Sequence, residues 1–241
     1  MAKLNIPSLQ HLARNWKDTP AKVCRELVKV AQHPPIMSYR PLYGAIRDML
    51  VFKTPYEDIV KGIQRHVKRE EDRKALLGVL PLIRDHFIQV APDYVNDVNQ
   101  RFYPAGRDLM IPFTPPLMYG VNGEKVFPWF SFWRSNPIAD QRLALFVSIV
   151  KDVLLQDPDL EDAKFLILDF SVPKGQDVRE LRIIDAGTVQ QISEAERKSM
   201  LEVFAEGYQQ AQAELAQEKK PSKAEERPQP DPNQPSLFDG K

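Results

Sequence analysis

The stretch from Leu143 to Leu155 constrains the fold more than any other part of the sequence. Its apolar residues are Leu143, Ala144, Leu145, Phe146, Val147, Ile149, Val150, Val153, Leu154 and Leu155. They cover most of the circumference of a helix, and a helix that is apolar nearly all round is buried on most sides. The unbroken run is far shorter than the roughly 18 residues of a membrane span. We therefore expect a buried central helix over residues 137–156 of a soluble domain, with Asn136 as its N-cap and Pro137 at its first position.

The composition narrows the functional classes. The chain has 241 residues and a formal net charge of +0, so it lacks the basic excess of proteins that bind phosphate backbones over a broad surface. A local basic patch, and with it direct nucleic-acid contact, stays open. Cys24 is the only cysteine, which excludes a disulfide framework and a thiolate zinc site and fits a reducing cytosol. Residues 1–16 lack the apolar core of a signal peptide, so we expect a cytoplasmic protein without a membrane partner.

The first third of the chain is typical of helices. One is expected from Thr19–Pro20 to the prolines after His33, and a second from the capping box Thr54–Glu57. A third helix is expected over residues 75–90, with Pro81 as a kink or break. We interpret residues 1–106 as a helical region.

Two hairpins are predicted on either side of the central helix. Asn122–Gly123 is a strong turn signal, and it places Tyr119 opposite Val126. The second hairpin turns within residues 173–178. There the alternation pairs Leu168 with Ile183 on one face and Asp169 with Arg182 on the other, as in a sheet covered on one side.

The C-terminal part of the chain divides at about residue 217. Ser193–Glu196 is a capping box that opens a C-terminal helix. Beyond it, the polar and proline-rich residues 217–241 have too little apolar surface to offset the entropy of ordering, so we expect a disordered tail. The predicted class is α+β: the helical region, an α+β domain over residues 107–216, and the tail.

An aromatic strand precedes the central helix. Its large rings are Trp129, Phe130, Phe132 and Trp133, which are able to stack single-stranded bases. Basic residues do not alternate with these rings, and aromatic side chains bury much area, so packing on the central helix is the favoured interpretation. Pro128 has no N–H for a sheet hydrogen bond, which predicts an edge strand or a bulge.

Three residues of the second hairpin are candidates for catalysis. Asp169, Glu180 and Arg182 resemble the acidic residue and the acid-x-basic pair with which restriction-like nucleases hold magnesium, although those enzymes carry lysine where Arg182 stands. The predicted register also makes Asp169 and Arg182 an ordinary surface pair, worth a few tenths of a kcal/mol by order of magnitude, and we favour this role. The sequence shows no glycine-rich phosphate loop, nucleophile elbow or paired metal-ligand spacing, so no metal or cofactor is predicted.

The tail carries the sharpest functional signal. It has a glutamine at position 234, a serine two residues later and then an apolar pair, which are the residues Gln234, Ser236, Leu237 and Phe238. In this spacing they resemble the peptide that binds the bacterial DNA polymerase sliding clamp. The resemblance implies that the glutamine hydrogen-bonds the clamp while the leucine and phenylalanine fill an apolar pocket on it. Pro235 departs from the leucine that often stands second in that family.

These observations give one leading hypothesis and two alternatives. The leading one is a bacterial replication- or repair-associated factor, or a toxin-like inhibitor of replication, that occupies the clamp through its tail. One alternative is a metal-dependent restriction-like nuclease that uses Asp169 and Glu180. The other is an interaction module of a toxin–antitoxin or phage-defence pair, with a chance match in the tail and a further protein partner for the folded body.

Overall fold

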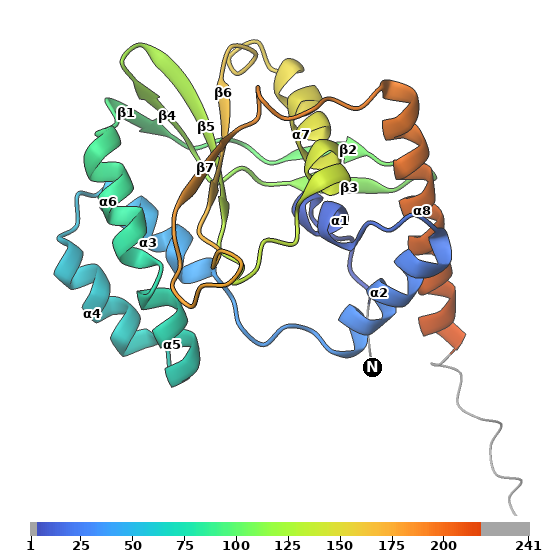
Figure 1. Ribbon diagram of the computed structural model, residues 1–241, viewed down its shortest axis with the longest axis horizontal. Helices are drawn as coiled ribbons and strands as arrows, with labels where there is room; N and C mark the ends of the chain where they lie inside the picture. Colours follow the sequence, from blue (N-terminus) through green and yellow to red (C-terminus); the bar gives the residue numbers. More distant parts are fainter. Residues whose placement is uncertain (1–3, 218–241) are drawn as a thin grey trace, which may run out of the picture.

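The structure is a computed structural model that describes residues 4–217, and it confirms the predicted α+β class (Figure 1). The helices are α1 (Leu9–Asn15), α2 (Pro20–Gln32), α3 (Arg40–Leu50), α4 (Tyr56–His66), α5 (Glu70–Leu77), α6 (Leu80–Val90), α7 (Asp140–Leu155) and α8 (Glu194–Gln217). The strands are β1 (Tyr94–Asn96), β2 (Arg101–Pro104), β3 (Met110–Phe113), β4 (Met118–Val121), β5 (Glu124–Ser131), β6 (Lys164–Asp169) and β7 (Arg182–Asp185).

Five strands form the main sheet, in the order β1-β4-β5-β6-β7, and β2 pairs with β3 in a separate two-stranded ribbon. Both predicted hairpins are confirmed: Tyr119 lies opposite Val126, and Asp169 lies opposite Arg182. The sequence did not predict the parallel pairing of β5 with β6. Because α7 connects these two strands as a crossover, it returns the chain to the same end of the sheet and β6 runs beside β5 in the same direction.

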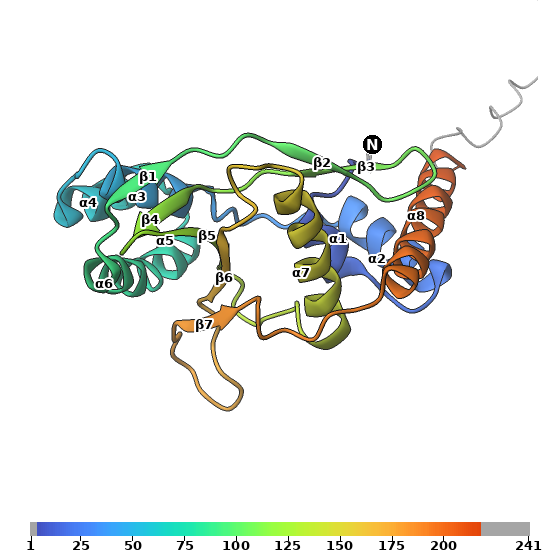
Figure 2. The ribbon, with the colours of Figure 1, turned by 90° about the horizontal axis from the view of Figure 1, so that it is seen from above.

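Both faces of the main sheet are covered, which corrects the expectation of a half-covered sheet. Figure 2 shows the strands between two groups of helices, with α3–α6 on one side and α1, α2, α7 and α8 on the other. Leu168 packs in the cluster with α3–α6, whereas its neighbour Ile167 packs in the cluster with α7. On the mixed face that was expected to meet solvent, the β6 residues Ile167 and Asp169 are therefore buried. Strand β7 is less covered: Arg182 is exposed, and Ile183 on the predicted apolar face is 50% exposed.

The aromatic strand β5 contributes to both clusters. Trp129 contacts Phe146 of α7 with ring centroids 5.4 Å apart, which confirms the packing interpretation on this face. Phe130 and Phe132 point to the other face and contact Tyr43 of α3. By sheet order β5 is not an edge strand, but it pairs with β4 only over residues 124–126. The segment that contains the proline of this strand has β6 alone as a neighbour, so it is a local edge.

The central helix is buried as expected, but it begins later than predicted. Residues 144–150 of α7 are all buried. The helix starts at Asp140, with Ala139 as its N-cap, and the carbonyl oxygen of Ala139 accepts the N–H of Arg142 at 3.1 Å. Its last residue also differs from the prediction: the side chain of Leu155 is 65% exposed.

The N-terminal half contains more elements than the sequence predicted. Helices α1 and α3 were not expected, while the break at Pro81 is confirmed because α6 begins at Leu80. The capping box at Thr54 was wrong: Pro55 is the N-cap of α4, and no side chain caps this end. Strands β1 and β2 precede residue 106, and they pair with β4 and β3 beyond it. Strand pairing therefore crosses the boundary between residues 106 and 107.

Helix α8 begins as predicted and packs along α2. The hydroxyl of Ser193 accepts a hydrogen bond from the backbone N–H of Glu196 at 3.1 Å, which confirms the cap. The expected tail was residues 217–241: Gln217 is the last residue of α8, and residues 218–241 lie outside the described residues. Within residues 4–217, none of the helices combines the length and the apolar character that a membrane span requires.

We expect Gly207→Ala to destabilise the contact between α2 and α8. A Cβ at Gly207 would lie 2.6 Å from the backbone oxygen of Pro20 and 2.6 Å from the Cβ of Val23, so the helices must separate to accept it. Overpacking of this kind costs about 1–3 kcal/mol. Gly62→Ala is the matched control, because a Cβ at this helical position meets nothing within 4 Å. The control should be neutral or stabilising by up to about 1 kcal/mol in urea denaturation.

Candidate functional site

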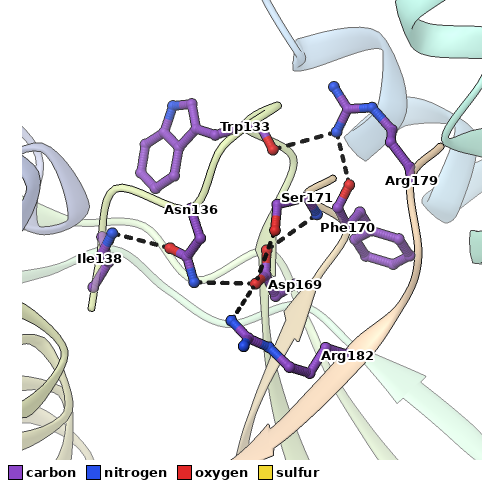
Figure 3. Close-up of polar contacts among 8 residues, drawn as sticks. All are labelled: Trp133, Asn136, Ile138, Asp169, Phe170, Ser171, Arg179 and Arg182. Atoms are coloured by element: carbon purple, nitrogen blue, oxygen red, sulfur yellow. Dashed lines mark hydrogen bonds and ion pairs between the residues drawn. The ribbon is translucent and has the colours of Figure 1, made fainter. Parts of the chain in front are cut away.

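Asp169 is the centre of the main polar cluster at the end of the parallel strands (Figure 3). Its side chain is 1% exposed, and it lies beside Ser131 at the end of β5. One carboxylate oxygen accepts hydrogen bonds from Asn136 Nδ2 at 3.0 Å, Arg182 Nη2 at 2.9 Å and Ser171 Oγ at 3.2 Å. The other accepts the backbone N–H of Ser171 at 3.1 Å. Protein donors therefore meet the needs of a buried carboxylate.

The cluster joins three separate segments of the chain. Asn136 donates to Asp169 and accepts the backbone N–H of Ile138 at 2.9 Å, which fixes the loop before α7. Ser171 closes a turn directly after β6, and Arg182 is the first residue of β7. We expected Asn136 to cap the central helix, which was wrong: its Oδ1 accepts the N–H of Ile138 as a cap would, but this bond closes a turn before the helix, and α7 begins only at Asp140.

The structure brings together two of the three catalytic candidates. Asp169 and Arg182 form the predicted pair, but it is not an ordinary surface pair, since the exposed fractions of the side chains are 1% and 65% respectively. Glu180 is exposed, and among the polar contacts of residues 4–217 its side chain takes no part in the cluster. Its backbone N–H donates to the carbonyl oxygen of Ser171 at 3.2 Å, which extends the hairpin pairing.

This arrangement lacks the features of a magnesium nuclease. In the part of the chain that the structure describes, no three His, Cys, Asp or Glu side chains are grouped so that they could hold a metal ion. Three of the four donors to Asp169 bond to Oδ2, and Oδ1 accepts only the backbone N–H of Ser171. The hydroxyl of Ser131 is buried beside this carboxylate but makes no hydrogen bond to it, so the two groups are not arranged as a nucleophile and its base.

Arg179 is a structural residue that the sequence analysis missed. Its Nη1 donates to the carbonyl oxygens of Phe132 at 2.9 Å and Phe170 at 2.8 Å, and more weakly to that of Trp133 at 3.3 Å. The guanidinium thereby joins the chain segments that leave β5 and β6. An arginine in a polar loop has no periodic or motif signal, so its role was not predictable from sequence.

Trp133 is the ring of the aromatic stretch that lies nearest to basic residues. The guanidinium of Arg14 lies 5.6 Å from the centroid of its ring, and His11 meets the ring edge-on at 6.0 Å. Burial lowers the pKa of His11, and the charge of Arg14 lowers this pKa further. Both effects favour the neutral form of the imidazole, and the guanidinium of Arg14 is the cation over this ring.

The tail motif lies outside the described residues. Gln234, Ser236, Leu237 and Phe238 follow the last described residue, Gln217 of α8. Comparison with known proteins adds no relative: no protein-family model matches the sequence, and no curated protein matches it. The motif therefore stays a prediction from sequence.

Proposed function

We propose that this protein docks on the bacterial DNA polymerase sliding clamp through Gln234, Ser236, Leu237 and Phe238. The observation that carries the proposal is the spacing of a glutamine, a small polar residue and an apolar pair in that order. Short linear motifs of this kind bind by placing apolar anchors in a groove on the partner. The proposal places the protein in the bacterial cytoplasm, as a factor associated with replication or repair or as an inhibitor that occupies the clamp.

The geometry of the folded body supports a docking role over a catalytic one. The candidate acid Asp169 is buried and bonded to protein donors, and Glu180 does not join it. The body then acts as the part that is brought to the clamp, and its two covered sheet faces give it a rigid framework.

The magnitudes predict weak binding by the peptide alone. Burial of Leu237 and Phe238 contributes about 1.5–3 kcal/mol each, and hydrogen bonds of Gln234 about 0.5–1.5 kcal/mol each. Ordering the backbone costs about 1–2 kcal/mol per residue, although the ring of Pro235 lowers its share. The surplus is well short of the roughly 12 kcal/mol of a nanomolar complex, so we expect micromolar or weaker affinity.

We expect the double change Leu237→Ala and Phe238→Ala to weaken clamp binding by about a hundredfold or more, since both apolar anchors are lost. Titration calorimetry of the full chain against the clamp measures this. Both changes lie outside residues 4–217, so the folded body should keep its structure.

Pro235→Leu is the matched gain-of-function variant. It restores the residue that often stands second in the family, and it should tighten binding. Equal affinities for the parent and the double alanine variant would contradict the proposed function.

A further inference from the structure

A pocket with apolar walls opens where the end of α7 meets the first residues of β6. Its volume is about 320 Å³. Its apolar walls are formed by Leu154, Leu155, Ala163 and Phe165, and its charged lining residues are Lys151, Glu161, Lys164 and Asp185. Leu155 is 65% exposed at this pocket, although it ends a helix that is otherwise a core element. The exposed leucine and the apolar walls together leave room for another apolar group, which would gain by burial there.

The chain supplies one apolar pair of suitable chemistry. Leu237 and Phe238 are the only large apolar residues in positions 218–241. We propose that the α7–β6 pocket binds these two side chains of the same chain. The folded body and the clamp then compete for the same motif. This competition rests on the function proposed above, whereas binding of the motif to the pocket does not.

The charged residues that line the pocket balance one another. They are two cations and two anions, Lys151, Lys164, Glu161 and Asp185. Lys164 lies 3.7 Å from Asp185. A lining without net charge disfavours a strongly charged segment, and it suits an apolar pair such as Leu237 and Phe238.

The chain is long enough to reach the pocket. Gly187 lines the pocket, and a short connection leads from it to α8, which has 24 residues. At about 1.5 Å per helical residue and at most about 3.6 Å per extended residue, Gln217 lies no more than about 60 Å from the pocket. The segment from Gln217 to Leu237 spans up to about 65 Å when extended.

A second apolar pocket is a poorer site for the same pair. It is lined by Met49, Phe87 and Ile88 at the ends of α3 and α6. Figure 1 places these helices at the opposite end of the molecule from α8, from which the C-terminal segment departs. Ile88 is 67% exposed there, close to the value for Leu155, so this pocket provides a matched control.

The docking is testable without the clamp. In methyl NMR spectra of the full chain, the signals of Leu154, Leu155 and Ala163 should shift when Leu237 and Phe238 are both changed to alanine. The shifts should not depend on protein concentration, since the contact is intramolecular. Unchanged methyl signals would overturn the proposal, and shifts that grow with concentration would assign the pocket to a second copy of the chain instead.

The competition is tested with Leu155→Asp against Ile88→Asp. Both changes are at exposed positions, so the melting temperature should hold in each variant. Leu155→Asp should raise the affinity of the full chain for the clamp by about threefold or more, because the motif no longer has to leave the pocket before it binds the clamp. Ile88→Asp should leave the affinity unchanged. Equal affinities for Leu155→Asp and the parent would contradict the competition between the pocket and the clamp. If the clamp binds none of these chains, the proposed function is contradicted. The methyl NMR signals then still test whether the tail residues bind the pocket.

Discussion

Phe146→Ala should cost about 3–5 kcal/mol of unfolding free energy. The side chain of Phe146 is 0% exposed, and its ring meets Trp129 at 5.4 Å and Phe165 at 6.1 Å between centroids. These contacts join α7 to both β5 and β6, so the cavity left by alanine opens between the helix and the parallel strands. A loss of this size is a large fraction of the 5–15 kcal/mol that stabilises a typical domain.

Urea denaturation, followed by tryptophan fluorescence, measures the effect. Leu155→Ala is the control on the same helix, and it should change the free energy of unfolding by no more than about 0.5 kcal/mol because that side chain is 65% exposed. If Phe146→Ala unfolds at the same urea concentration as the parent, the centre of the core lies elsewhere.

The sequence predicted the elements with strong local signals. The turn at Asn122–Gly123 and the alternation around residues 173–178 set both hairpin registers, because a shift of one residue would expose an apolar face. The apolar residues of α7 identified the central helix, because they cover most of the circumference of a helix. In each case the decisive information lies within a few neighbouring residues.

What the sequence did not predict depends on contacts between distant segments. The parallel pairing of β5 with β6 follows from the way α7 packs, and periodicity does not encode it. The start of α7 was misplaced because Asn136 makes the local hydrogen bond of a cap, to the N–H of Ile138, in a turn that does not continue as a helix. The bond from its Nδ2 to a carboxylate 33 residues away holds this turn in place. The short helix α1 has too few residues for a clear period.

The same distinction explains the prediction of the site. The pairing of Asp169 with Arg182 followed from register alone, whereas the burial of Asp169 depends on Asn136 and Ser171. The local sequence pattern therefore identified Arg182 correctly as the partner of Asp169, but it placed the pair on the surface, whereas the carboxylate is buried. The environment decides the energetics, since breaking a pair that leaves polar groups buried costs far more than breaking an exposed one.

Asp169→Ala should therefore cost about 2–4 kcal/mol, instead of the few tenths expected for a surface pair. The change leaves two half-buried donors, the amide of Asn136 and the backbone N–H of Ser171, without their acceptor, and each orphaned donor costs about 1–3 kcal/mol. Arg182→Ala should cost less, about 1 kcal/mol, because the carboxylate keeps its other donors and the arginine is 65% exposed. Glu180→Ala at an exposed position is the control and should stay within about 0.5 kcal/mol.

The order of these three losses separates a structural role from a catalytic one. A structural Asp169 predicts that the isosteric Asp169→Asn also lowers stability, by about 1–3 kcal/mol, since an amide offers one acceptor oxygen where the carboxylate uses two. It predicts as well that the parent does not cleave plasmid DNA when magnesium is added. A parent that cleaves DNA, combined with an Asp169→Asn variant that loses cleavage at unchanged stability, would contradict the structural role and favour the restriction-like nuclease. A loss of stability without cleavage in either protein would leave the buried carboxylate as the group that holds the loop before α7, the end of β6 and the start of β7 together.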